Sequence, residues 1–252
     1  MKIKIKRPLI FVMALLPIAL IGGLTTGIYT YESCSKEMQQ TLLLQTGGYV
    51  PYLAAITLQV VLYAVICGFL GCILAEKVGL MRPIQFKKEA WCRTCLLGVI
   101  SGLAFGLDYW IFGEIIPEVA TSCENITISN FIASVLYGGI IEEVMLRLFT
   151  MSLIVFLIWK VFFRTLPKDQ IPGRVFIAAN ILSALIFAAG HLPATFLTFE
   201  QVSAIVIFHC FLYNGGLGIV FGHLYGEYGI QYAMTGHILC HIISKLIWIV
   251  LV

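Results

Sequence analysis

Three charged residues, Glu142, Glu143 and Arg147, lie within a stretch of sequence that is otherwise apolar and long enough to cross a membrane. Each charge near the centre of a bilayer costs roughly 2.5–3.5 kcal/mol on insertion scales. The i,i+4 spacing of Glu143 and Arg147 places them on one helix face, where they can form an ion pair. Glu142 lies about 100° further round the helix and has no obvious local partner. An unpaired carboxylate at membrane depth indicates a functional site.

Three histidines later in the chain could work with this glutamate. His191 ends the segment Phe-Ala-Ala-Gly-His, and His237 and His241 stand four residues apart in the last apolar segment. Two imidazoles at i,i+4 project from one helix face, a spacing that metal sites use. The alternative is that each histidine only joins two helices by a hydrogen bond. Three histidines together with an unpaired glutamate favour a site for proton transfer or metal binding.

The composition requires that these residues be positioned by membrane helices. The 252 residues are 60% hydrophobic and 12% charged, with a mean hydropathy of +0.97, whereas soluble domains have about 25% charged residues. The net charge of +3 is small, and the basic residues of the chain cluster in short loops. Such clusters indicate membrane topology, so we expect no nucleic-acid partner. We therefore predict an integral, multi-pass protein of the lipid bilayer, in the plasma membrane if the source is prokaryotic.

The apolar segments predict an all-α bundle of seven or eight transmembrane helices. Residues 1–127 supply about three N-terminal membrane helices, and residues 128–252 form a membrane domain that carries all the candidate site residues. We expect both parts to pack as one integrated bundle. The predicted spans are 8–27, 49–74, 94–112, a long tract 128–163, 175–196, 202–225 and 229–252.

The charges of the loops predict how the bundle is oriented. The amino terminus and the loops near residues 77–93 and 160–174 are rich in Lys and Arg, whereas the loops near 32–37 and 114–124 are acidic or nearly free of them. The positive-inside rule places the amino terminus and the two basic loops in the cytoplasm. As one straight helix the long tract would measure roughly 54 Å, well beyond a bilayer core of ~30 Å. It is either one crossing with a tilted or in-plane extension, which the loop charges favour, or two crossings.

The charged cluster and the histidines resemble the motifs of a known family. Glu142-Glu143-Val-Met-Leu-Arg147 is similar to the EExxxR motif of the type II CAAX-prenyl proteases and bacteriocin-processing proteins, the CPBP or Abi family of intramembrane proteases. The segment from Phe187 to His191 matches the FxxxH motif of that family, and His237 matches the histidine that opens its HxxxN or HxxxD motif. The resemblance covers roughly residues 128–252. It implies an intramembrane endopeptidase that cleaves a membrane-associated peptide or protein.

The same residues suit peptide hydrolysis, which needs an activated water and a group that stabilises the oxyanion. We expect Glu142 to be the general base and His191 to hold or polarise the water. Glu143, paired with Arg147, would fix the helix and tune Glu142. His237, together with His241, would stabilise the oxyanion. The substrate class stays open between a prenylated carboxyl terminus, a bacteriocin leader and a signalling-peptide precursor.

One position departs from the family pattern, and two alternatives follow. His241 stands where the family has Asn or Asp, although an imidazole can also donate a hydrogen bond or bind metal. A zinc ion held by Glu142, His191, His237 and His241 is the first alternative, with the glutamate mechanism slightly favoured and no cofactor certain. The second is a membrane immunity or partner-binding protein that uses the same scaffold without catalysis. A transporter is disfavoured, because no inverted repeat is evident.

The remaining polar residues and the cysteines suggest structural roles. We expect Asp108 to act at a span end or in helix packing, and expect hydrogen bonds between helices from a group of other residues: Asn180, His209, Asn214 and His223. Cys34 and Cys123 fall in predicted outer loops and could form a disulfide if those loops meet. Cys92 and Cys95 have the spacing of a redox motif, but we interpret it as coincidence at a basic loop edge.

Overall fold

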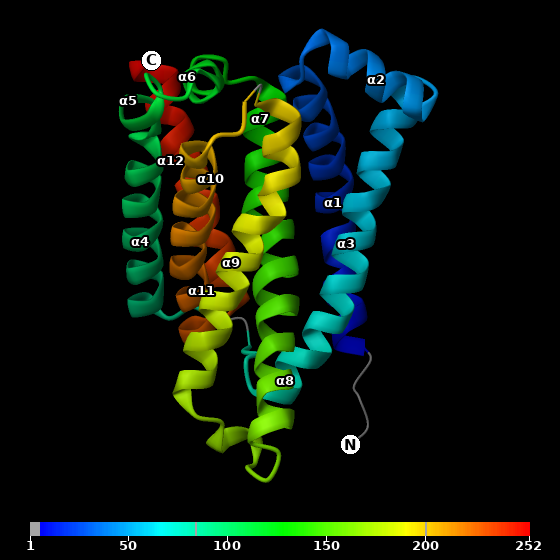
Figure 1. The fold of residues 1–252 in the computed structure, drawn as a ribbon. Helices are drawn as coiled ribbons and strands as arrows, with labels where there is room; N and C mark the ends of the chain where they lie inside the picture. The colour runs from blue at the N-terminus through cyan, green and yellow to red at the C-terminus, as the bar shows by residue number, and fades with distance from the viewer. Residues whose placement is uncertain (1–5, 84, 200) are drawn as a thin grey trace.

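The chain folds into a bundle of long helices. The computed structural model describes residues 6–83, 85–199 and 201–252, which contain helices and no strand. Among these residues, seven helices are long and apolar enough to cross a membrane. They run up and down the bundle in sequence order, and shorter helices cover one end (Figure 1). The predicted all-α membrane fold is confirmed.

Most of the seven spans are regular α-helices close to the predicted ranges. They begin and end where turn-forming residues occur, as at Gly79, which adopts a left-handed conformation with φ of 81° after α3. The fourth span is described below. The other six are α1 (Lys6–Ser33), α3 (Tyr49–Val78), α4 (Lys88–Gly106) with its short continuation α5 (Asp108–Phe112), α9 (Gly173–Thr198), α10 to α11 (Ala204–Tyr228) and α12 (Ile230–Leu251).

The long apolar tract is one continuous crossing. It consists of α7 (Ile128–Ala133), η1 (Ser134–Glu142), η2 (Val144–Met151) and α8 (Ser152–Phe162), together 35 residues. Both middle segments are π-helical. At 1.5 Å per residue the tract measures about 52 Å, so it is longer than a bilayer core, and α8 extends beyond the lower ends of α4 and α11 (Figure 1). The single crossing favoured by the loop charges is the one observed.

The helices of the two halves of the sequence share a core. Buried side chains from α1 and α3 meet others from η1, η2, α8, α9, α11 and α12. Close approach depends on small residues: at Gly71 of α3, a Cβ atom would lie 2.9 Å from the Leu148 side chain of η2. Large side chains in lipid-facing positions stay exposed, as expected where the apolar solvent is the membrane. This packing holds the π-helical tract at the centre of the bundle.

Polar contacts join several helices away from the site. His209 of α10 lies 2.8 and 3.0 Å from the two carboxylate oxygens of Asp108, and Asn180 of α9 donates to the carbonyl of Ile219 in α11. The interhelical bonds expected of His209 and Asn180, and the packing role expected of Asp108, are confirmed. Asn214 differs from the prediction, because its amide donates within its own helix to the carbonyl of Cys210.

The cysteines of the described chain are free thiols, including Cys34 and Cys123, so the disulfide considered for this pair does not form. Both are buried. Burial raises the pKa of the Cys123 thiol to about 12 and also raises the pKa of the Cys34 thiol. Both thiols therefore stay protonated near neutral pH, where a thiol is a weak nucleophile. Cys92 and Cys95 are exposed.

Candidate active site

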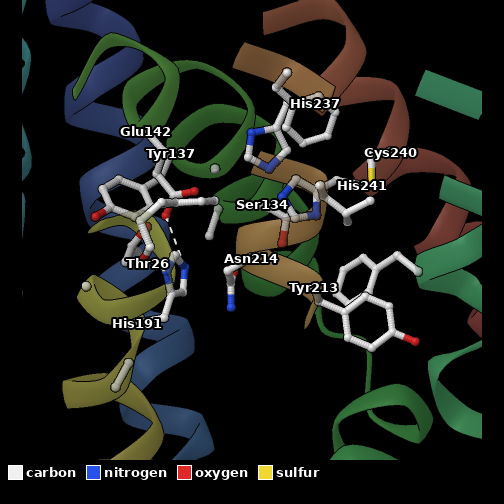
Figure 2. A pocket seen from close by; sticks show the side chains of 18 of the residues that line it. Thr26, Ser134, Tyr137, Glu142, His191, Tyr213, Asn214, His237, Cys240 and His241 are labelled. Atoms are coloured by element: carbon white, nitrogen blue, oxygen red, sulfur yellow. Dashed lines mark hydrogen bonds and ion pairs between the residues drawn. The ribbon is translucent and has the colours of Figure 1, made fainter. Parts of the chain in front are cut away.

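A cavity of about 360 Å³ lies within the bundle, and it collects the residues singled out from the sequence. Its walls come from α1, α4, α7 to η1, α9, η4 (Phe211–Gly215), α11 and α12. Glu142, His191, His237 and His241 all line it, and their side chains surround one space in Figure 2. The structure thus brings Glu142, His191 and His237, which the sequence analysis assigns to one hydrolytic site, to one cavity.

Glu142 and His191 face each other across part of this cavity. The His191 Nε2 atom lies 3.7 Å from Glu142 Oε1, and the side chains are 31% and 11% exposed, respectively. His191 Nδ1 lies 2.9 Å from the carbonyl oxygen of Phe187, one turn earlier in α9. A carbonyl can only accept, so Nδ1 carries the proton, and Nε2 of the neutral ring is an acceptor. When the ring is neutral, a carboxylate oxygen and an unprotonated ring nitrogen therefore point at the same space.

Glu143 lies at the centre of a buried network. Its Oε2 atom is 3.4 Å from Arg147 Nε, which confirms the predicted ion pair. Its Oε1 atom is 2.9 Å from Nδ1 of His237, a residue 94 positions later. Both side chains of the ion pair are almost fully buried, with 0% exposure for Glu143 and 1% for Arg147. A charge removed from water at this depth needs every available partner, and Glu143 has two.

Arg147 is held by three kinds of contact. Besides Glu143, its Nη2 atom donates to the carbonyl oxygen of Gly218 in α11 at 2.8 Å. Its guanidinium also lies over the ring of Phe187 at 5.0 Å, a cation–π arrangement. Gly218 permits this approach, because a Cβ atom there would lie 3.1 Å from Arg147 Nη2. Arg147 thus ties η2 to α9 and α11 and lies outside the cavity lining.

The two histidines of α12 stack on each other. The rings of His237 and His241 have centroids 4.7 Å apart and planes inclined by 25°, and Phe221 stacks on the His237 ring. Since Glu143 accepts from Nδ1 of His237, Nε2 is the ring nitrogen left for the cavity. The Nδ1 atom of His241 is buried without a hydrogen-bond partner. His241 is the residue that stands in place of the Asn or Asp of the family motif.

The four residues considered for zinc are not arranged as a metal site. Among the described residues, no group of three or more His, Cys, Asp or Glu side chains could hold a metal ion. Nδ1 of His191 bonds a carbonyl and Nδ1 of His237 bonds Glu143, so Nε2 is the nitrogen of each ring that could act as a ligand. Catalytic zinc needs three protein ligands converging at about 2 Å. In the described residues these side chains do not converge on a three-ligand position.

Two cavity residues were not expected in the site from the sequence. Tyr137 and Asn214 line the cavity beside the glutamate and the histidines (Figure 2). Both belong to π-helical segments, η1 and η4, and such segments are frequent at functional sites. Asn214 is a polar residue within a membrane span, which was a usable signal. Tyr137 had none, because π-helical geometry cannot be read from the pattern of apolar residues.

Comparison with known proteins agrees with the motifs. Residues 124–243 match the family model of the type II CAAX prenyl endopeptidase Rce1-like proteins. The matched segment contains Glu142, His191 and His237 and extends through the cavity-lining part of α12. No curated protein and no solved structure matches the chain. The family predicted from the three motifs is confirmed.

Proposed function

From this Rce1-like scaffold we propose that the protein is an intramembrane endopeptidase that uses a water activated by Glu142 and His191. The observation that carries the proposal is the pair of acceptors, Glu142 Oε1 and His191 Nε2, facing one cavity at 3.7 Å. A water between them can donate one hydrogen to each acceptor. Its lone pair is then directed away from both, toward a peptide carbonyl in the cavity.

In this mechanism Glu142 takes the proton of the attacking water and later returns it to the leaving amine. The environment supports the assignment, because the carboxylate is largely buried yet borders the cavity. Water exclusion strengthens every electrostatic interaction with the reacting groups. His191 also positions the water, since its bond to the Phe187 carbonyl fixes the orientation of the ring and its tautomer.

His237 and His241 are proposed to stabilise the oxyanion. The Glu143 carboxylate orients His237 through Nδ1, in the way that a carboxylate orients a catalytic imidazole elsewhere. A doubly protonated His237 ring presents its Nε2 hydrogen to the cavity as a donor. His241, stacked beside it, supplies a second ring where the family pattern has an amide or a carboxyl group. Glu143 and Arg147 act as positioning residues, because they hold the helices that carry the site.

The test compares wild-type protein with Glu142→Gln in proteoliposomes. Both are incubated with a proteome-derived peptide library in water enriched in heavy oxygen, and the new carboxyl termini are read by mass spectrometry. We expect wild-type-specific products that carry one heavy oxygen, a loss of at least 100-fold for Glu142→Gln, and a comparable loss for His191→Ala. Cleavage that persists in Glu142→Gln would reject the mechanism. A cellular phenotype unchanged by Glu142→Gln would instead favour a partner-binding protein without catalysis.

A further inference from the structure

A second cavity lies at one end of the bundle. Its volume is about 640 Å³, and it is bordered by the ends of α1 and α9, the loop before α6 (Pro117–Glu124) and the start of α10. Polar residues form much of its wall, including Ser33, Ser35, Thr121, Thr198, Gln201 and Ser203. We refer to it as the upper cavity, because the elements that border it, among them α6, lie at the top of the bundle in Figure 1.

The two cavities follow one another along the same two helices. We refer to the first cavity, which Glu142 lines, as the catalytic cavity. On α1, Thr30 lines the catalytic cavity and Ser33 lines the upper cavity. On α9, Ala194 lines the catalytic cavity and Thr198 lines the upper one. Three or four residues correspond to about one helical turn, or roughly 5 Å. About one helical turn therefore separates the linings of the two cavities along these helices.

Between Glu142 and the other end of the bundle, the interior is filled by packed side chains. Below Glu142 on the same tract, Arg147, Leu148 and Met151 are each at most 2% exposed. Next to them the Ser152 and Tyr225 hydroxyls, also buried, form a hydrogen bond of 2.8 Å between the tract and α11. Interiors packed in this way leave no room for a peptide. Among the described residues, packed side chains therefore close the bundle below Glu142.

The charges at the two ends identify the compartment. Around the upper cavity the described helix ends and loops carry five glutamates and a single cation, Lys36: Glu32, Glu37, Glu114, Glu118 and Glu124. The other end of the bundle carries most of the Lys and Arg: Lys6, Arg7, Lys77, Arg82, Lys87, Lys88, Arg93, Lys160, Arg164, Lys168 and Arg174. The basic end of a membrane bundle faces the cytoplasm.

We propose that the substrates are peptides presented on the extracytoplasmic side of the membrane, which reach Glu142 through the upper cavity. The proposal rests on the endopeptidase function argued above and adds the compartment and the route. It disfavours a prenylated cytoplasmic carboxyl terminus as substrate, since such a peptide would meet the closed, basic end. It favours a leader or signalling peptide that emerges from the outer surface.

Cysteine accessibility in intact cells tests the route without a known substrate. Ser33→Cys reports on the upper cavity and Thr30→Cys on the catalytic cavity, and a membrane-impermeant maleimide is the probe. Labelling is read site by site by mass spectrometry, so the native, exposed Cys92 and Cys95 at the basic end are internal controls. Leu24→Cys, exposed on the same helix as Thr30, controls for reagent that enters the bilayer.

We expect Ser33→Cys and Thr30→Cys to label in intact cells at least tenfold faster than Cys92, Cys95 and Leu24→Cys. Labelling of Thr30→Cys only after permeabilisation, together with Cys92, would overturn the orientation. Labelling of Ser33→Cys without Thr30→Cys would overturn the connection between the cavities. The measurement does not need activity. If Thr30→Cys labels from outside while Glu142→Gln still cleaves peptides, the route stands and the proposed mechanism fails.

Discussion

Replacing Arg147 with Ala tests whether this residue holds the fold or performs the chemistry. The substitution removes the 3.4 Å ion pair with Glu143, the 2.8 Å hydrogen bond to the Gly218 carbonyl and the contact with the Phe187 ring. It leaves Glu143, which is 0% exposed, with His237 as its remaining partner. Removing one member of a buried ion pair typically costs about 3–5 kcal/mol.

A loss of this size is measurable on purified protein. For a chain of 150–250 residues, 1 kcal/mol lowers the Tm by about 2–4 °C, so Arg147→Ala should lower it by on the order of 10 °C. The assay is thermal unfolding in detergent, followed by the monodisperse fraction after heating. Glu142→Gln is the matched control, because it keeps the shape of a neighbouring carboxylate that borders the cavity. Its Tm should stay within about 2 °C of the wild type.

A double variant separates the ion pair from the other contacts. Glu143→Gln removes the charge that Arg147→Ala strands, so the double variant should recover part of the stability lost in Arg147→Ala, with a coupling of about 0.5–3 kcal/mol. Normal membrane levels and an unchanged Tm for Arg147→Ala, with activity alone abolished, would refute this reasoning. That result would assign Arg147 to the substrate or the reacting atoms.

Three further predictions concern packing and metal. Gly138→Ala should abolish cleavage with little loss of folded protein, because the new methyl group meets His241 Nε2 at 2.7 Å; normal turnover would contradict the proposed role of this ring. Gly222→Ala should lower the Tm by several degrees because its Cβ atom overlaps the Asn180 side chain, whereas Gly216→Ala in the same helix has nothing within 4 Å and should be neutral or stabilising; equal Tm values would contradict the packing. Exhaustive chelation should leave the cleavage rate unchanged, since the described residues gather no three-ligand group; activity lost on chelation and restored by zinc would overturn the metal-independent mechanism.

Much of the fold could be predicted from the sequence because membrane spans depend on local composition. The long apolar segments predicted seven or eight crossings, and the charges of the loops favoured one crossing for residues 128–163, which gives the seven candidate spans of the structure. Pairing at i,i+4 is also local, so the contact of Glu143 with Arg147 followed from spacing alone. The motif spacing was enough to predict that Glu142, His191 and His237 share a site.

The sequence by itself therefore determined the membrane helices, the Glu143–Arg147 pair and the identity of the groups that could do chemistry. Only the tertiary structure decided how those groups are connected. The bond between Glu143 and His237 joins residues 94 positions apart, and the Glu142–His191 pair depends on how α9 packs against η2. The π-helical form of the tract sets which side chains face the cavity. Such contacts arise from the packing of distant helices, and no local pattern of apolar and polar residues encodes them.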